Sequence, residues 1–231
     1  SEMCIRDRGW TEPFELDKVQ ILDNYYLSAQ KSDIAFLKKM DTARLLAGFR
    51  TTAGIDTKGV RPYGGWEDSL LGGHCVGHYL TALAQAVKVT GDKELKEKSQ
   101  TLIAGLEECQ KKLGTGFLFG AKVEDKEDVE KQFDILEGKK KGETWVPWYN
   151  MHKVLAGLVD TYKYTGNETA LLVAEKLGDW IYERVSKWDL KTNQKVLETE
   201  YGGMNDCLYE LYSYSCLLYT SPSPRDRSLS R

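Results

Sequence analysis

The sequence has 231 residues, of which 41% are hydrophobic and 29% are charged, a composition typical of globular domains. Its 32 basic and 35 acidic side chains are interleaved and leave a formal net charge of -3, which gives no basic patch for nucleic acid or an anionic membrane surface. No apolar run approaches the roughly 20 residues of a membrane-spanning helix, so we expect neither nucleic acid nor a membrane as a partner.

The two ends of the chain look foreign to its centre. Back-translation of EMCIRDR (Glu2–Arg8) and CLLYTSPSPRD (Cys216–Asp226) can reproduce, on opposite strands, the end sequence of a transposase used to build sequencing libraries. We therefore interpret 1–8 and 216–231 as adapter-derived flanks and 9–215 as the biological segment, the N-terminal part of a longer domain.

The first elements of this segment have the apolar spacing of helices. After an extended lead at 14–22, apolar residues between 34 and 49 predict helices that end near Gly54. The next helix is expected to start near Gly77 and to stop at Gly91, and Asp92 is a good N-cap for a partner helix. The sequence therefore predicts two antiparallel helices joined by a tight turn.

The same pattern returns 75 residues after Gly91, at Gly166, where another apolar helix ends and a further one begins at Asn167. A third copy is expected to begin with the helix at 204–213. Helical hairpins in series predict an all-α fold. The long loops between pairs favour a closed α/α toroid over an open solenoid, because such loops build a pocket at one end.

Aromatic and polar residues cluster just before the first helix of each pair, in YGGWE with two following histidines, in WVPWYNMH and in EYGGMND. In a toroid these positions converge on one face, where aromatic rings can stack on a sugar and polar side chains can supply directional hydrogen bonds. The alternative for any single aromatic is a structural staple at a helix start, and Pro147 also fits turn chemistry. The candidate stacking residues are Tyr63, Trp66, Trp145, Trp148 and Tyr149.

His74 and His78 lie four residues apart, so they share one helix face in a spacing that suits a metal, a catalytic pair or a sugar-binding wall. A metal needs a third and usually a fourth ligand. Cys75 follows His74 directly and is expected to point about 100° away from it on the helix, which argues against joint ligation. We therefore expect no metal at this pair. The other side chains that could complete a ligand set are Glu67, Asp68 and His152.

Three cysteines remain once Cys4 and Cys216 are assigned to the flanks. They are odd in number and lack CxxC spacing, so they predict packing rather than a disulfide framework or a zinc knuckle. They are Cys75, Cys109 and Cys207.

Carboxylates in the same loops could form an acid/base pair for glycoside hydrolysis. The candidates are Glu67, Glu200 and Asp206, and the sequence leaves open whether any two of them face each other.

Three long motifs in this order resemble the catalytic domain of the β-L-arabinofuranosidase group, glycoside hydrolase family 127 and its relative family 146. They are YGGWEDSLLGGHCVGHYLTALA, WVPWYNMHKVLAGLVDTYKYTGN and TEYGGMNDCLYELY, and the CQKKLGTGFLFG and FDIL segments add to a likeness that covers about Phe14 to Tyr212. The resemblance implies a six-hairpin (α/α)6 barrel, present here in part. It also implies removal of non-reducing terminal β-L-arabinofuranose from plant-type glycans with retention of configuration.

The resemblance further implies a cysteine thiolate nucleophile held by zinc and a glutamate acid/base, all downstream of the last familial residue in this chain. The cysteines present do not match the nucleophile position. Cys207 stands where relatives usually carry an aliphatic residue, and Asp206 where they commonly carry Glu. We therefore expect no catalytic residue and no metal ligand here, zinc only in the full-length parent, and a fragment that is inactive and poorly soluble.

What the resemblance carries over is contact with an arabinose-containing glycan. It implies this role for His152 above all, and then for His78, His74, Trp66, Glu67, Trp148, Asn205 and Asp206. Two other kinds of function stay open. One is an α/α-toroid sugar epimerase or polysaccharide lyase, which would need its histidine acid/base pair within this segment, and the other is a non-catalytic helical carbohydrate-binding scaffold.

Overall fold

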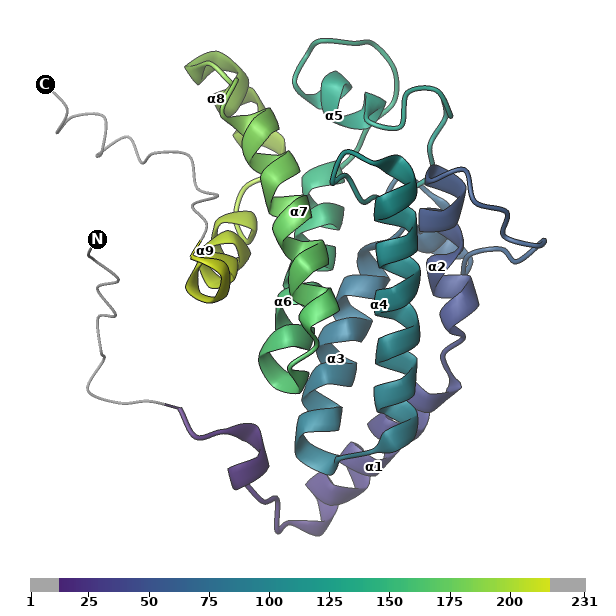
Figure 1. Ribbon diagram of the computed structural model, residues 1–231, viewed down its shortest axis with the longest axis vertical. Coiled ribbons are helices and arrows are strands. Elements are labelled where there is room, and N and C mark those ends of the chain that lie inside the picture. The colour runs from purple at the N-terminus through teal and green to yellow at the C-terminus, as the bar shows by residue number, and fades with distance from the viewer. Residues whose placement is uncertain (1–12, 217–231) are drawn as a thin grey trace, which may run out of the picture.

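The structure is a computed structural model that describes residues 13–216 (Figure 1). Over this range the chain forms helices joined by loops, without a β-strand, so the predicted all-α fold is confirmed. None of these helices combines the length and the apolar character that crossing a bilayer requires. The flanks interpreted as adapter-derived, 1–8 and 216–231, lie outside the described residues apart from Cys216.

The helices follow one another as hairpins. The α3–α4 and α6–α7 pairs form the centre, with α4 and α7 in front of α3 and α6 in the view of Figure 1. The elements are η1 (Leu16–Lys18), α1 (Asn24–Lys39), α2 (Thr42–Thr52), η2 (Gly65–Asp68), α3 (His74–Thr90), α4 (Lys93–Leu113), α5 (Lys131–Leu136), α6 (Pro147–Thr165), α7 (Glu168–Val185), α8 (Leu190–Thr199) and α9 (Met204–Ser215).

The turns of the two hairpins use the residues that the sequence indicated. Gly91 and Gly166 have φ values of 66° and 67°, the left-handed conformation that ends a helix without a side-chain clash. Asp92 then accepts a hydrogen bond from the Leu95 amide, and Asn167 accepts one from the Ala170 amide. The predicted turn chemistry is confirmed at both positions.

Four elements differ from the prediction. The lead at 14–22 contains the short η1 helix, and α3 starts at His74 rather than near Gly77. The earlier start of α3 is possible because the Glu67 carboxylate accepts hydrogen bonds from the Gly73 and Cys75 amides, which lie at the helix N-terminus. The sequence analysis also did not predict α5 and α8, which lie within the loop before α6 and the loop before α9.

The first helices of the two hairpins run parallel and in close contact. A Cβ atom on Gly77 would lie 1.9 Å from the carbonyl oxygen of Lys153, and one on Gly157 would lie 2.5 Å from the carbonyl oxygen of Gly77. Further along, the Thr81 hydroxyl donates to Asp160 at 2.6 Å. Because contacts advance in the same direction on α3 and α6, the N-terminal ends of both helices lie at one end of the molecule.

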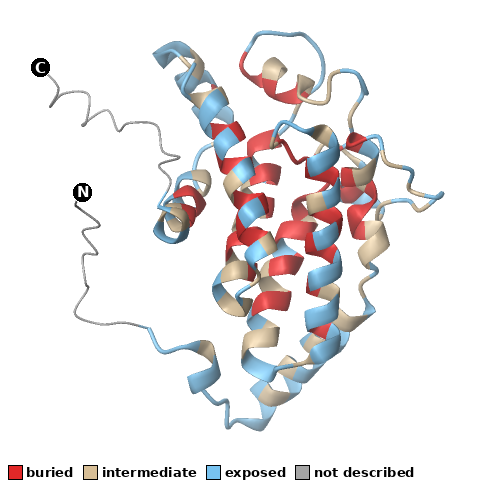
Figure 2. Ribbon diagram, in the orientation of Figure 1, coloured by how far each residue is buried: buried red, intermediate tan, exposed pale blue. Residues whose placement is uncertain are grey.

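Buried residues line the facing sides of the central helices, whereas α1 and α8 are largely exposed (Figure 2). An aromatic cluster joins the loop between α4 and α6 to the second hairpin. It is formed by Phe117, Phe119, Phe133, Trp148 and Trp180, with neighbouring ring centroids 4.8 to 6.0 Å apart.

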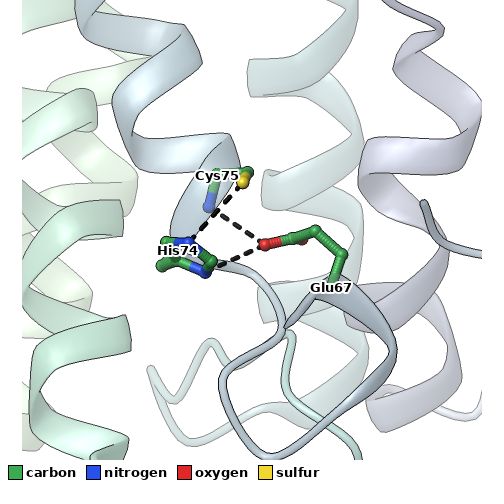
Figure 3. A group of neighbouring side chains, drawn as sticks. All are labelled: Glu67, His74 and Cys75. Carbon is green, nitrogen blue, oxygen red and sulfur yellow. Dashed lines mark hydrogen bonds and ion pairs between the residues drawn. The ribbon is translucent and has the colours of Figure 1, made fainter. Parts of the chain in front are cut away.

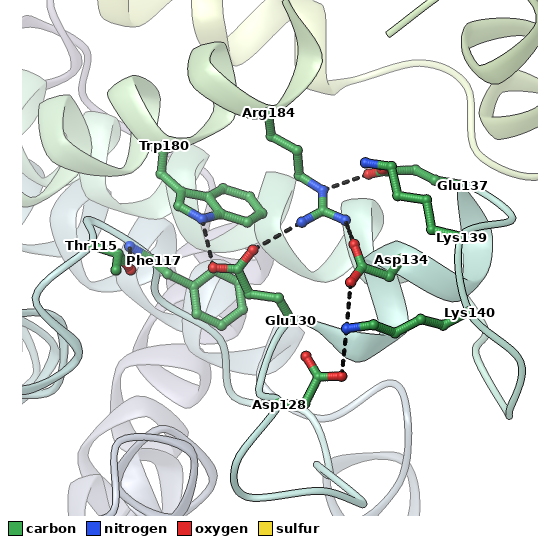
Figure 4. Close-up of polar contacts among 10 residues, drawn as sticks. All are labelled: Thr115, Phe117, Asp128, Glu130, Asp134, Glu137, Lys139, Lys140, Trp180 and Arg184. Carbon is green, nitrogen blue, oxygen red and sulfur yellow. Dashed lines mark hydrogen bonds and ion pairs between the residues drawn. The ribbon is translucent and has the colours of Figure 1, made fainter. Parts of the chain in front are cut away.

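Arg184 on α7 binds the loop between α4 and α6 through ion pairs (Figure 4). Its guanidinium forms ion pairs with Glu130, Asp134 and Glu137, and the Glu137 side chain is fully buried. Lys140 bridges Asp134 to a further carboxylate in the loop. These contacts hold the loop that leads into α6, and so they help to set the position of the α6 N-terminus.

Candidate functional site

Aromatic and imidazole rings from two hairpins meet where α3 and α6 begin. His74 has its ring centroid 6.4 Å from that of Trp66, 6.1 Å from that of His78 and 6.1 Å from that of Tyr149, and Tyr149 lies 6.4 Å from His152. We call these five residues the ring surface. The structure therefore brings together residues that are up to 86 positions apart in the chain, at the end where the loops converge.

The ring surface has solvent-exposed rings on one side and buried rings on the other. Trp66 is 68% exposed and Tyr149 is 38% exposed, and His78 is also exposed, whereas His74 is only 7% exposed at the base. His152 is partly buried, and its ring packs against Gly203 in the loop before α9. Exposed ring faces beside imidazole nitrogens are the kind of surface on which a sugar can stack and form hydrogen bonds.

Glu67 fixes the start of α3 and the orientation of His74. Its carboxylate accepts from the Gly73 and Cys75 amides and pairs with His74 Nδ1 at 2.9 Å. Burial by itself would raise the pKa of Glu67, but the hydrogen bonds from His74 and the two amides outweigh it and lower that pKa. Glu67 is therefore an ionised, buried carboxylate with its oxygens already engaged.

Glu200 plays the corresponding part at α6, although it comes from the third copy. Its two oxygens accept from the Trp148 amide at 3.2 Å and the Tyr149 amide at 2.6 Å, at a helix start where Val146 offers no capping side chain. Burial raises the pKa of Glu200 to about 7, against the opposing effect of these two hydrogen bonds. The loop before α9 is thus joined directly to the second hairpin.

Several predicted site residues are not members of the ring surface. Trp148 is 6% exposed, and its indole packs against Phe133 and Trp188 in the core, because it faces inward while the next residue, Tyr149, faces out. Tyr63 lies at the start of α2 under the guanidinium of Arg44. Three other predicted residues are exposed, namely Trp145 before α6 and Asn205 and Asp206 in the first turn of α9, and the charge of Asp206 acts on His152 of the ring surface.

Lys153 is a residue of this region that the sequence analysis missed. Its ammonium lies 5.0 Å from the Tyr149 ring centroid. Burial, helped by the Lys153 charge, lowers the pKa of His78 and lowers that of His152 to about 4, so both imidazoles are neutral at pH 7. The position of Lys153 four residues after Tyr149 on the same helix face was the available signal.

Glu67, His74 and Cys75 offer ligand atoms that all lie within 4.8 Å of one another (Figure 3). The expectation that Cys75 points away from His74 is wrong, since Cys75 Sγ lies 3.6 Å from His74 Nε2. The reason is that bonds to Glu67 and to the carbonyl of Leu71 turn the imidazole so that its Nε2 faces the sulfur.

This trio does not fit a zinc ion. His74 Nδ1 lies 2.7 Å from the Leu71 carbonyl oxygen and 2.9 Å from a Glu67 oxygen, and two acceptors at these distances require a proton on Nδ1. A protonated nitrogen cannot be a ligand, and the Glu67 oxygens already accept hydrogen bonds from the Gly73 and Cys75 amides. Nε2 and the sulfur are then the two free ligand atoms of the trio. Zinc sites use three or four protein ligands.

Helical hairpins in series, with the starts of their first helices gathered at one end, define the α/α-barrel class of fold, of which the described residues form a part. Over residues 18–216 the sequence matches the family described as β-L-arabinofuranosidase, GH127 catalytic domain. The chain belongs to this family, as the sequence motifs indicated.

The fold is also similar to that of a solved protein, a GH127 β-L-arabinofuranosidase from Geobacillus stearothermophilus T6. The TM-score is 0.61 at 15% sequence identity, and the match covers 87% of this chain and 31% of that chain. At this identity the likeness establishes the fold, and the chain spans about a third of the length of that protein. No curated protein matches the sequence.

Proposed function

We propose that this chain forms the sugar-binding part of a retaining glycoside hydrolase that removes non-reducing terminal β-L-arabinofuranose from plant-type glycans. The observation that carries the proposal is the ring surface, which two successive hairpins of a GH127 catalytic domain build at the converging ends of α3 and α6. The partner is then an arabinose-containing glycan.

Within this proposal the exposed rings and the neutral imidazoles have separate roles. Trp66 stacks on the apolar face of the sugar, and His78 and His152 form hydrogen bonds with its hydroxyl groups as neutral donors and acceptors. Asn205 and Asp206 add polar contacts from α9. Glu67 acts through His74, which it orients, and Trp148 acts through its packing against Phe133 in the core.

We further propose that the described residues bind the sugar without cleaving the glycosidic bond. Glycoside hydrolysis needs two available carboxyl groups or an equivalent nucleophile and acid. The oxygens of Glu67 and Glu200 are held by backbone amides at two helix starts, which supports a structural role for both. By resemblance to the family, a zinc-held thiolate and an acid/base glutamate in the rest of the parent domain would supply the chemistry.

The binding proposal can be tested by calorimetry with methyl β-L-arabinofuranoside. Trp66→Ala is expected to weaken binding at least tenfold because the exposed stacking face is lost. Tyr182→Ala, which removes a 44% exposed ring on α7 away from the ring surface, should leave the affinity unchanged. Equal losses in both variants, or no binding by the unchanged chain, would contradict the proposal.

Activity is a separate measurement on the same 231-residue chain. We expect no release of arabinose from an aryl β-L-arabinofuranoside, and steady turnover would overturn the proposed lack of cleavage. With the full-length parent, an epimerised or unsaturated sugar product would favour the epimerase or lyase alternative over hydrolysis.

A further inference from the structure

Cys75 has a histidine and a carboxylate aligned behind it, and the proposed sugar binding makes no use of the sulfur. Cys75 Sγ lies 3.6 Å from His74 Nε2, and His74 Nδ1 lies 2.9 Å from Glu67 Oε1 (Figure 3). A thiol, an imidazole and an orienting carboxylate in this order form the arrangement that activates nucleophiles in many enzymes.

The hydrogen bonds around His74 determine where protons can go. Nδ1 holds a proton because it faces the Leu71 carbonyl and Glu67, so the free nitrogen of the neutral ring is Nε2, directed at the sulfur. When Nε2 takes the thiol proton, the resulting imidazolium lies between a thiolate and the Glu67 carboxylate. The contacts with Cys75 and Glu67 raise the pKa of His74 to about 10, consistent with a stabilised imidazolium.

One positive charge lies near this arrangement, the Lys153 ammonium over the Tyr149 ring, and it opposes a positive charge in this region. The groups that face the His74 ring are Glu67 from η2, His78 from α3 and Tyr149 from α6, together with Trp66. Burial lowers the pKa of His78, so it is neutral at pH 7. Glu67 is the carboxylate in direct contact with the His74 imidazole, and its sign favours the imidazolium.

The position of Cys75 adds to the effect and distinguishes it from the other cysteines. It is the second residue of α3, where the helix dipole favours a negative charge, and it is partly exposed. Cys109 and Cys207 are buried, and burial raises the pKa of both thiols, that of Cys109 to about 12. Cys216 is exposed at the end of α9 and provides an ordinary thiol for comparison.

We propose that Cys75 is a reactive thiol, activated by His74 and Glu67, and a site of covalent modification by small electrophiles such as hydrogen peroxide. The thiolate attacks one peroxide oxygen, so that an S–O bond forms and the O–O bond breaks. The sulfur is oxidised to a sulfenic acid and the peroxide is reduced. The leaving hydroxide takes the proton from His74 Nε2 and departs as water. This reactivity does not depend on the proposed sugar binding.

The test is alkylation of the folded 231-residue chain with iodoacetamide, followed by mass spectrometry that resolves each cysteine. An S–C bond forms and iodide leaves, so the rate reports the thiolate. At pH 6 we expect Cys75 to react at least tenfold faster than Cys216. The contact between Cys75 and His74 is the reason for this difference, because Cys216 has no imidazole aligned with its sulfur among the described contacts.

His74→Gln is expected to slow Cys75 at least tenfold at pH 6 and to leave the rate of Cys216 unchanged. If Cys109 and Cys207 stay protected from alkylation in the variant, the variant is folded. Glu67→Gln is a second variant, expected to slow the alkylation of Cys75 by a smaller factor. Equal rates for Cys75 and Cys216, or no effect of His74→Gln in a folded variant, would overturn the proposal. If His74→Gln unfolds, the relative alkylation rates of Cys75 and Cys216 in the unchanged chain decide the matter.

Hydrogen peroxide provides the second probe. Dimedone labels sulfenic acids, and we expect the label on Cys75 before it appears on Cys216 at neutral pH. Label that accumulates equally on both residues would show that Cys75 is only an accessible thiol.

Discussion

Arg184 is the largely buried cation that three carboxylates share, and its loss leaves Asp134 and Glu137 with only the more exposed Lys140 and Lys139 as partners. Arg184→Ala is expected to destabilise the protein by about 3–5 kcal/mol, measured as the free energy of unfolding in urea. Lys111→Ala is the control, because Lys111 pairs with Glu107 on the exposed side of α4 and such pairs contribute less than about 1 kcal/mol. Losses of similar size in the two variants would show that the Arg184 pairs behave as surface pairs.

Gly77 has no room for a side chain. Gly77→Ala would place a methyl group 1.9 Å from the Lys153 carbonyl oxygen, so α3 and α6 must move apart, at a cost of about 3 kcal/mol or more. Gly91→Ala is the matched control at the end of the same helix. It has no atom within 4 Å and should cost only about 1 kcal/mol, from its φ of 66°. Thermal unfolding of both variants distinguishes packing from backbone strain.

At this scale the sequence predicted which residues gather but not how each side chain is oriented. The four-residue spacing placed His74 and His78 on one face, and their rings lie 6.1 Å apart. The sequence could not predict that Glu67 turns the His74 ring toward Cys75, because that depends on a loop that folds back over the helix start. Trp148 was expected beside a ligand, but its indole lies in the core. On α6 it is the next residue, Tyr149, that faces outward.

At the scale of the element, α6 depends on a carboxylate supplied from outside its own sequence. Burial raises the pKa of Glu200 from 4.5 to about 7, so the folded protein binds a proton there more tightly than the unfolded chain does. Stability from this group is therefore present at low pH and is lost as the pH rises from about 4.5 to 7. The contribution is at most about 3 kcal/mol.

Glu200→Gln keeps an acceptor for the α6 amides but cannot titrate. We expect the difference in unfolding free energy between the two proteins to change by about 1–3 kcal/mol between pH 4.5 and pH 7.5, in the direction that favours the unchanged chain at the lower pH. Urea unfolding at the two pH values measures this difference. Parallel pH dependences would mean that Glu200 titrates near its ordinary pKa.

The elements that the sequence predicted are those with a long apolar stripe and a clear turn. The two hairpins meet both conditions, with glycine ends at Gly91 and Gly166 and acidic or amide caps after them. The short α5 and α8 meet neither. The six residues of α5 are held by Arg184 and the aromatic cluster, and α8 has Val196 as its one buried residue among those described. Long-range packing defines such helices, and local patterns do not report it.

For the whole molecule, apolar side chains on the outer helices predict self-association. The α1 helix has no buried residue and exposes Tyr25, Tyr26 and Phe36 at 61–77%. We expect the chain to form oligomers at micromolar concentrations in light scattering coupled to gel filtration, because such surface favours association. Phe36→Lys with Tyr26→Lys should shift the chain toward the monomer, whereas Lys31→Glu should not. A monodisperse monomer at all concentrations would contradict this expectation.

The overall architecture followed from the repeat. A period of 75 residues with similar loops predicted that the first helices align and that their loops share one end, and the parallel contacts between α3 and α6 agree with this. The closeness of the two helices was harder to predict, because it depends on Gly77 and Gly157 facing each other. A glycine in a helical sequence can equally indicate a destabilised helix or a turn.

The bond between Glu200 and the start of α6 also bears on how such barrels can be recombined. Each hairpin looks like a module that ends with its second helix, so a chimera would naturally be cut soon after α7. Because the carboxylate that completes the second hairpin lies in the following loop, such a cut would separate α6 from its cap. The exchangeable unit therefore extends past residue 200, and a boundary placed there should give folded chimeras where one placed after α7 does not.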